Sequence, residues 1–148
     1  MVTVVLVVFI VLSVLLFVFS LLWMQGEREN LKTMTELCEI GVETQAHLTY
    51  KEPLRGTTTL RVRYTFRAPN GDKGEYQTGV GNSPVHVLGD TYPLVHHPRL
   101  LSRVHLGTMK TVRKERRTRA SYVRTAQRLA LLSLTACGLA VAGLVLSP

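Results

Sequence analysis

The sequence predicts a membrane protein in which two transmembrane helices flank a small all-β domain, a four- to five-stranded antiparallel open barrel or sandwich. Both ends of the 148-residue chain are apolar over about the thickness of a bilayer, and the middle alternates apolar and polar residues with a period of two. The regions expected are residues 1–24 as a transmembrane helix (an uncleaved anchor), 25–37 as a connector, 38–108 as the β domain, 109–128 as a basic juxtamembrane helix, and 129–146 as the second transmembrane helix.

The first apolar segment is long enough to cross a bilayer. Residues 1–24 contain no charged side chain, and eighteen of them are Val, Leu, Ile or Phe. At about 1.5 Å per residue this helix would be about 36 Å long, against a hydrocarbon core of about 30 Å. A cleaved signal peptide is the alternative, but the segment lacks a basic start and a small-x-small cleavage site. Trp23 then falls where interfacial aromatic residues are favoured.

The second apolar segment, residues 129–146, is just long enough, at about 27 Å by the same rise. Ala136, Gly138, Ala140 and Ala142 have the small-x-x-x-small spacing that lets helices approach closely. Three interpretations stay open for this spacing: packing against the first span, a homodimer, or no specific contact.

The positive charge is concentrated beside the second span. All eighteen Lys and Arg residues lie between the two apolar segments, and residues 109–128 carry eight of them against one acid. Cations next to a span resist translocation. We therefore expect a two-span protein of the cell membrane, with the β domain in the cytoplasm and both termini outside.

The same cations predict contact with anionic lipid headgroups. Each cation near such a surface contributes about 1 kcal/mol, and long side chains beside a span can snorkel to the headgroups. Nucleic acid is an unlikely partner, because Tyr122 is the sole aromatic residue of the segment and offers little base-stacking surface. The residues expected at the headgroups are Lys110, Arg113, Lys114, Arg116, Arg117, Arg119, Arg124 and Arg128.

Period-two alternation predicts the strands of the middle domain. It begins at Cys38, continues through Ile40 and Val42, and resumes at Ala46, Leu48 and Tyr50. Residues 60–67 alternate apolar residues with Arg and Thr in the same way. Asn70-Gly71 signals a hairpin turn before a returning strand over 74–80. Further strands are expected near 91–96 and over 103–106.

Three stretches of the middle domain resemble a known family. The stretches "GVETQAHLTY", "LRVRYTFRAPNGDKGEYQTGVGNSP" and "VLGDTYPLVHHPRLLSRVHL" are similar to the domain of unknown function numbered 3592, found in small bacterial membrane proteins. The resemblance covers Gly41 to about Leu106. His96 and His97 stand where that family usually has an aromatic residue and an acid, and Leu101 stands where its second proline is common. The resemblance implies the architecture and no catalytic residue.

The sequence offers little catalytic or metal-binding chemistry. His96 and His97 are adjacent on an expected strand, so they point to opposite faces and cannot readily share a metal. His47, His86 and His105 lack a Cys or acid cluster with ligand spacing. "GVGNSP", residues 79–84, lacks the Gly-Lys-Ser/Thr end of a phosphate loop, and neither Ser83 nor Ser102 lies in a nucleophile motif. No cofactor, metal or enzymatic activity is expected.

A row of arginines on one predicted strand bears on possible partners. Arg61, Arg63 and Arg67 form a basic outer face that could bind an acidic partner, although the plainer interpretation is a solvated face paired with Glu43 or Glu75.

Cys38 and Cys137 are expected in different environments, so no disulfide between them is predicted.

The sequence therefore favours an anchored interaction or accessory module of unknown molecular activity. An accessory subunit of a membrane transport or export complex is the alternative, and a membrane-bound enzyme is less favoured because no acid-base pair is visible. The expected partners are the lipid bilayer and either a membrane protein or a second copy of the chain.

Overall fold

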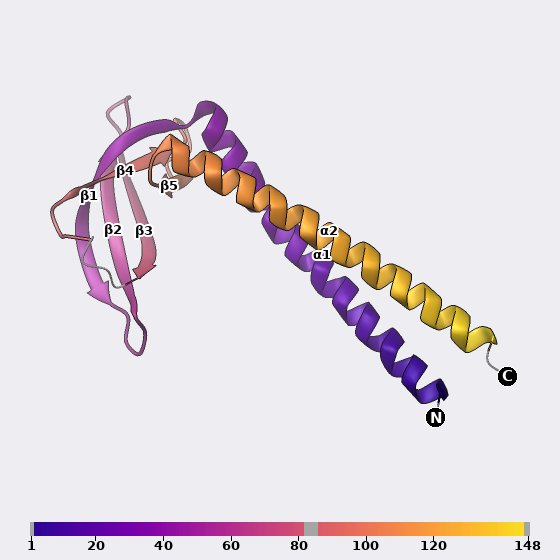
Figure 1. Cartoon of the computed structure of the whole chain (residues 1–148). Helices are drawn as coiled ribbons and strands as arrows, with labels where there is room; N and C mark the ends of the chain where they lie inside the picture. The colour runs from indigo at the N-terminus through magenta and orange to yellow at the C-terminus, as the bar shows by residue number, and fades with distance from the viewer. Residues whose placement is uncertain (1, 82–85, 147–148) are drawn as a thin grey trace. The chain divides into compact units, whose positions relative to one another are not determined.

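Two long helices precede and follow a β domain in the computed structural model, which describes residues 2–81 and 86–146 (Figure 1). By contacts the chain divides into two compact units: residues up to 32 together with those from 117 onward, and residues 33–116. The elements in order are α1 (Val2–Ile40), β1 (Val42–Pro53), β2 (Thr59–Arg67), β3 (Lys73–Gly81), β4 (Thr91–His96), β5 (Val104–Leu106) and α2 (Met109–Leu146).

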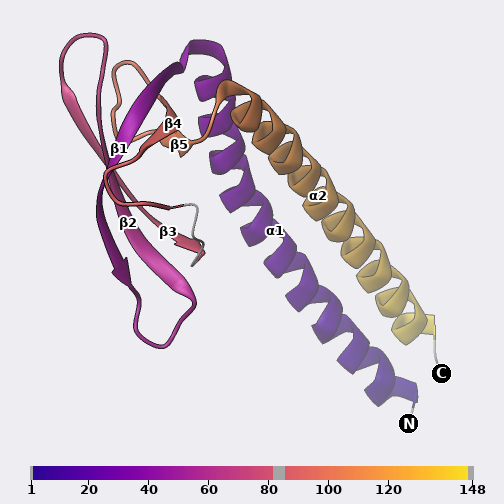
Figure 2. The same ribbon diagram turned by 60° about the vertical axis from the view of Figure 1, so that its left-hand side comes forward.

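The five strands form one antiparallel sheet in the order β3-β2-β1-β4-β5, curved into a nearly closed barrel (Figures 1 and 2). The predicted class is confirmed: two long apolar helices flank a five-stranded antiparallel barrel in the chain. The strands predicted near 74–80, 91–96 and 103–106 correspond to β3, β4 and β5.

The alternation of β2 builds the core of the barrel. Leu60, Val62, Tyr64 and Phe66 are at most 5% exposed, whereas the residues between them face outward. Burying one large apolar side chain stabilises a fold by roughly 1.5–3 kcal/mol. The other buried members of this cluster are Ala46, Leu48 and Leu94.

A bulge in β1 turns Tyr50 away from the core. Leu48 pairs with Tyr64, but Tyr50 pairs with Arg63, so Thr49 is an extra residue in the strand. The expectation that Tyr50 continues the inward series of Ala46 and Leu48 is therefore wrong. One inserted residue moves every later side chain of the strand to the opposite face.

The strand predicted to begin at Cys38 is also wrong, because α1 continues to Ile40 and β1 begins at Val42. Residues 25–37, expected as a connector, belong to the same helix. Tertiary packing decides the conformation here, since Leu37 and Cys38 lie in a cluster with Val95 and Val112. The helix ends at Gly41, whose N–H donates to the Leu37 carbonyl at 3.1 Å. A Cβ at Gly41 would lie 2.2 Å from that carbonyl oxygen.

The first residues of α2 are capped from β1. The backbone N–H of Met109 donates to the Glu43 carboxylate at 2.9 Å. A carboxylate at a helix N-terminus satisfies an N–H group that lacks an intrahelical partner and complements the helix dipole. Glu43 is thereby used by α2, and not by the arginines of β2.

Candidate functional site

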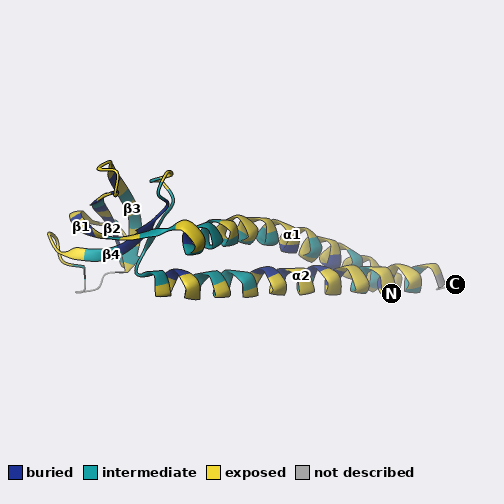
Figure 3. Ribbon diagram, turned by 90° about the horizontal axis from the view of Figure 1, so that it is seen from above, coloured by how far each residue is buried: buried dark blue, intermediate teal, exposed yellow. Residues whose placement is uncertain are grey.

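Both helices are long and apolar enough to span a membrane, by length and composition. Many of their large apolar residues are exposed, and exposed residues recur along both helices in Figure 3. Leu12, Leu22 and Leu139 are 59%, 64% and 71% exposed. Contiguous apolar surface on this scale is unusual on a soluble monomer and is typical of membrane or protein interfaces.

Small residues form the buried side of α2 beyond residue 117. Ala126, Ala130, Ser133 and Ala140 are buried, three, four or seven residues apart, which places them on one helix face. The predicted small-residue spacing is only partly on this face: Ala140 is buried and Ala136 half-buried, but Gly138 and Ala142 are exposed.

Contacts between described residues join α1 and α2 within the unit that comprises residues up to 32 and from 117 onward. A Cβ at Gly143 would lie 3.9 Å from the methyl groups of Leu6. The rings of Trp23 and Tyr122 lie 6.4 Å apart between centroids. One helical turn further along α1, Glu27 accepts from Arg119. Of the three interpretations left open for the small residues, these contacts favour packing within one chain.

Arg119, one of the residues predicted to contact lipid headgroups, forms an ion pair with Glu27 of α1. Arg119 donates from Nη1 to both Glu27 carboxylate oxygens, at 3.1 and 3.0 Å, and its side chain is 31% exposed. No sequence pattern indicated this pair. The available signal was Glu27 itself, an acid just after the first span, opposite the basic segment in an antiparallel hairpin.

The other predicted lipid contacts lie mostly at the surface of α2. Arg116 is half-buried. Arg124 is exposed, and its Nε also donates a hydrogen bond to the Ala120 carbonyl at 3.3 Å. The exposed ones are Lys110, Arg113, Lys114, Arg117, Arg124 and Arg128.

The three arginines of β2 line the outer face of the barrel, as predicted from the alternation. Arg61, Arg63 and Arg67 are all exposed. The Arg63 guanidinium lies 5.5 Å from the centroid of the Tyr50 ring, a contact made available by the β1 bulge. None of the three belongs to an ion pair within the part of the chain that the structure describes, so Glu43 and Glu75 do not neutralise this face.

A groove of about 480 Å³ opens on the same outer face, at one end of β2. No sequence pattern indicated it. Its lining comes from three strands: Thr44, Gln45 and His47 of β1, Thr65, Phe66 and Arg67 of β2, and Lys73, Gly74 and Glu75 of β3.

His96 and His97 have separate structural positions. The fully buried His96 ring packs against Phe66, with centroids 5.0 Å apart. Its Nδ1 lies 3.1 Å from the His97 carbonyl, and Nε2 has no hydrogen-bond partner among the described residues. No group of three or more His, Cys, Asp or Glu residues that could hold a metal ion occurs in residues 2–81 and 86–146.

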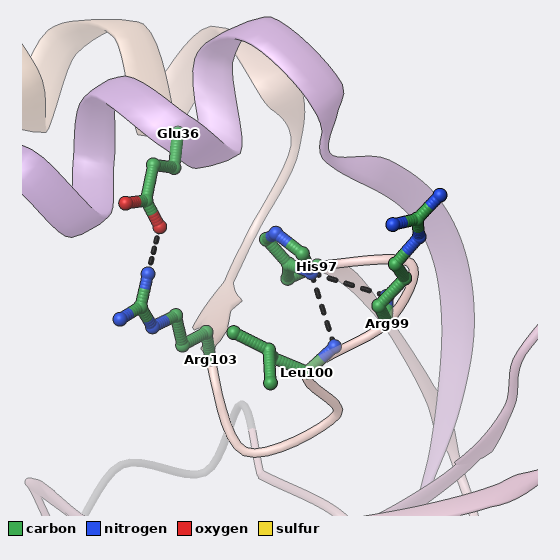
Figure 4. A network of polar contacts seen from close by, with 5 residues as sticks. All are labelled: Glu36, His97, Arg99, Leu100 and Arg103. Atoms are coloured by element: carbon green, nitrogen blue, oxygen red, sulfur yellow. Dashed lines mark hydrogen bonds and ion pairs between the residues drawn. The ribbon is translucent and has the colours of Figure 1, made fainter.

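His97 instead organises the loop between β4 and β5 (Figure 4). Its Nδ1 accepts hydrogen bonds from the backbone N–H of Arg99 at 3.1 Å and of Leu100 at 3.0 Å. An Nδ1 that accepts must lack a proton, so the neutral ring carries its proton on Nε2. Arg103, at the end of this loop, forms an ion pair with Glu36 of α1.

Tyr64 is the largest fully buried side chain of the barrel and carries a strongly perturbed group. Its hydroxyl lies 3.0 Å from His86 Nδ1, and its ring contacts those of Tyr76 and Tyr92. Burial, and next the nearby Tyr92 and Tyr76, raise the pKa of Tyr64 to about 12. A phenol held in its neutral form suits a structural hydrogen bond better than nucleophilic chemistry.

The remaining sequence motifs add no arrangement of catalytic groups. Gly79, Val80 and Gly81 belong to the last part of β3, and Asn82, Ser83 and Pro84 of "GVGNSP" lie outside the described residues. Ser102 is exposed in the loop before β5. Cys38 and Cys137 are half-buried free thiols.

Comparison with known proteins adds no family or function to this geometry. No family model matches the chain, and neither a curated protein nor a solved structure matches it.

Proposed function

We propose that this protein spans the cell membrane twice, through α1 and α2, and holds its barrel in the cytoplasm as an anchored interaction or accessory module. The observation that carries the proposal is the exposed apolar surface of both helices, preceded on α2 by a dense run of cations. Apolar surface of this extent is stable in hydrocarbon and costly in water.

The orientation rests on the distribution of charge. Residues 109–128 carry an excess of seven positive charges, and such segments remain on the cytoplasmic side. The barrel is continuous with this segment through the short connection 107–108. The far ends of both helices would therefore lie outside the cytoplasm.

The exposed cations of α2 support contact with anionic lipid. Lys110, Arg113, Arg117 and Arg128 lie at the surface and belong to no ion pair among the described residues. Arg119 is the exception, because Glu27 already neutralises it. Lipid contact would strengthen the anchor without determining its activity.

A pair of topology reporters tests the orientation. Alkaline phosphatase fused after residue 148 is active only outside the cytoplasm, and green fluorescent protein at the same position fluoresces only inside it. We expect phosphatase activity and no fluorescence. Bright fluorescence without phosphatase activity would contradict the proposed topology.

Crosslinking in intact membranes tests the accessory role and distinguishes it from the enzyme alternative. An integral-membrane partner that copurifies reproducibly would support an accessory module, and a crosslinked dimer would indicate self-association. Reversing the charge of Arg61 and Arg63 together should release an acidic partner of the β2 face while the barrel stays folded. If no partner crosslinks under any condition, the accessory role is wrong.

A further inference from the structure

The groove on the outer face of the barrel forms where two strands separate. The β1–β2 ladder ends at the pair His47 and Thr65. Beyond that pair β2 stays with β3, up to Arg67 opposite Lys73, while β1 continues along β4. The space of about 480 Å³ lies beside this separation and is lined by residues of β1, β2 and β3, both outward-facing and inward-facing ones.

The floor of this groove is built into the core. Phe66 is 3% exposed, and its ring lies over Gly74, where a Cβ would come within 2.3 Å of the ring. The aromatic ring thus occupies the space that a side chain at position 74 would take. Because Phe66 also packs in the core cluster, the groove is a fixed feature of the barrel.

The two cations of the groove repel each other when no ligand is bound. Arg67 and Lys73 are directly opposite each other on neighbouring strands, and both are exposed. Like charges in such a pair destabilise a sheet. Neither forms an ion pair within the described residues. Glu75, also in the lining, lies opposite Thr65 instead.

We propose that the groove binds a small molecule carrying a phosphate group, held by Arg67 and Lys73. An anion between the two cations turns their mutual repulsion into attraction, and charge-assisted hydrogen bonds to phosphate are the strong ones. Thr44, Gln45 and Thr65 supply neutral donors for the remaining oxygens. The volume exceeds what a bare phosphate needs and falls in the range of small-molecule sites.

The two cations bind the phosphate group whether it belongs to a soluble molecule or to a lipid. Glu75 in the same lining can accept a hydrogen bond from a hydroxyl or amine elsewhere on the ligand. This site is independent of the proposed membrane topology, because every lining residue belongs to the barrel.

Titration of the full chain in a maltoside detergent, which contains no phosphate, tests the site. The probes are inorganic phosphate, glycerol 3-phosphate and micelles doped with phosphatidic acid, each against potassium chloride at equal ionic strength. Backbone amide resonances of Thr65 and Gly74 report binding. We expect saturable shifts with at least one phosphate probe and none with chloride. Saturation by the soluble probes identifies a free ligand, and saturation by phosphatidic acid alone identifies a lipid headgroup.

Two variants and a matched control distinguish binding in the groove from a general effect of the protein's net charge. The double substitution Arg67→Gln and Lys73→Gln should weaken phosphate binding about tenfold or more, the loss of two charge-assisted contacts. The control, Arg61→Gln with Arg63→Gln, removes the same amount of charge from β2 outside the groove and should change affinity less than about twofold.

A further variant, Lys73→Glu, tests the site if the double glutamine variant does not fold. It places a carboxylate opposite Arg67, so it should abolish phosphate binding while preserving or raising the melting temperature. The proposal is overturned if no phosphate probe saturates, or if the groove variants and the control weaken binding equally.

Discussion

Arg119 of α2 donates from one nitrogen to both carboxylate oxygens of Glu27 in α1, at 3.0 and 3.1 Å, across 92 residues of sequence. The Glu27 side chain is only 12% exposed. This contact fixes the register of the two helices next to the aromatic pair formed by Trp23 and Tyr122.

Breaking the Glu27–Arg119 pair should loosen the helix pair. We expect Glu27→Gln or Arg119→Gln each to cost about 1 kcal/mol, the upper end for partly exposed ion pairs. The exchanged pair, Glu27→Arg with Arg119→Glu, should recover part of that loss. Unfolding in mixed micelles by dodecyl sulfate, followed by the fluorescence of Trp23, the single tryptophan, measures the effect.

Arg117→Gln is the matched control for this pair. Arg117 is exposed and belongs to no ion pair among the described residues, so its loss removes the same charge without breaking the contact. Equal destabilisation by the substitutions at 117 and 119 would mean that net charge, and not the pair, determines the stability.

Tyr64 should make the barrel less stable at alkaline pH. Because burial raises its pKa to about 12, the folded chain keeps the phenol proton where the unfolded chain, with a pKa near 10.0, has lost it. The resulting stabilisation is full below pH 10 and disappears as pH rises toward 12, a change of about 2 kcal/mol.

Tyr64→Phe isolates this effect from other alkaline titrations. It removes both the ionisation and the hydrogen bond with His86, so it should be less stable than wild type by about 1 kcal/mol near neutral pH. Chemical unfolding between pH 8 and 11.5 should show the gap narrowing as pH rises. A gap that stays constant would show that the phenol does not titrate differently in the two states.

His97 should be replaceable by Asn but not by Ala. In His97→Ala the N–H groups of Arg99 and Leu100 lose their acceptor, at a cost of about 0.5–1.5 kcal/mol for each hydrogen bond. An Asn side chain places its oxygen on Cγ, where the His ring carries Nδ1, and local Asn-to-backbone bonds of this kind are common in turns.

Hydrogen exchange at Leu100 separates a lost acceptor from lost packing at position 97. The amide should be protected in wild type and in His97→Asn, and should exchange quickly in His97→Ala. Equal exchange in both variants would assign the role of His97 to its ring volume and not to Nδ1.

Gly74 should not tolerate a side chain. A Cβ at this position would lie 2.3 Å from the Phe66 ring, so Gly74→Ala must displace a buried aromatic residue, at a cost of about 1–3 kcal/mol. Gly81→Ala on the same strand meets nothing within 4 Å and should change the melting temperature little. Similar melting temperatures for the two variants would show that Phe66 can move without cost.

The alternation of β2 was sufficient to predict its buried face, because every second residue from Leu60 to Phe66 is large and apolar and the intervening ones are polar. The same rule failed for Tyr50 and for Cys38. A bulge at Thr49 shifts the phase of the pattern without changing the sequence signal. Cys38 and Ile40 fit a period of two as well as the last turn of a helix, and only the contact of Leu37 with Val95 and Val112 decides between them.

The candidate sites were less predictable than the strands because they depend on partners distant in sequence. The exposure of Arg61, Arg63 and Arg67 follows from local alternation. The use of Glu43 as a cap for Met109 depends on how the chain returns from β5. The groove beside Arg67 lies where the β1–β2 ladder ends at His47 and Thr65 while β1 remains paired with β4 and β2 with β3, a pattern of pairing that no single strand encodes.

The bond between Glu43 and Met109 has a further consequence for how such a protein can evolve. It joins the first residues of the barrel to the first residue after it, so the chain leaves the barrel beside the point where it entered. Residues 41–107 therefore leave one helix and return to the other at neighbouring points, so we expect their loops to tolerate changes in length without displacing either helix. The barrel is in this respect an insertion between two helices, and its two ends require only that one helix ends beside the start of the other.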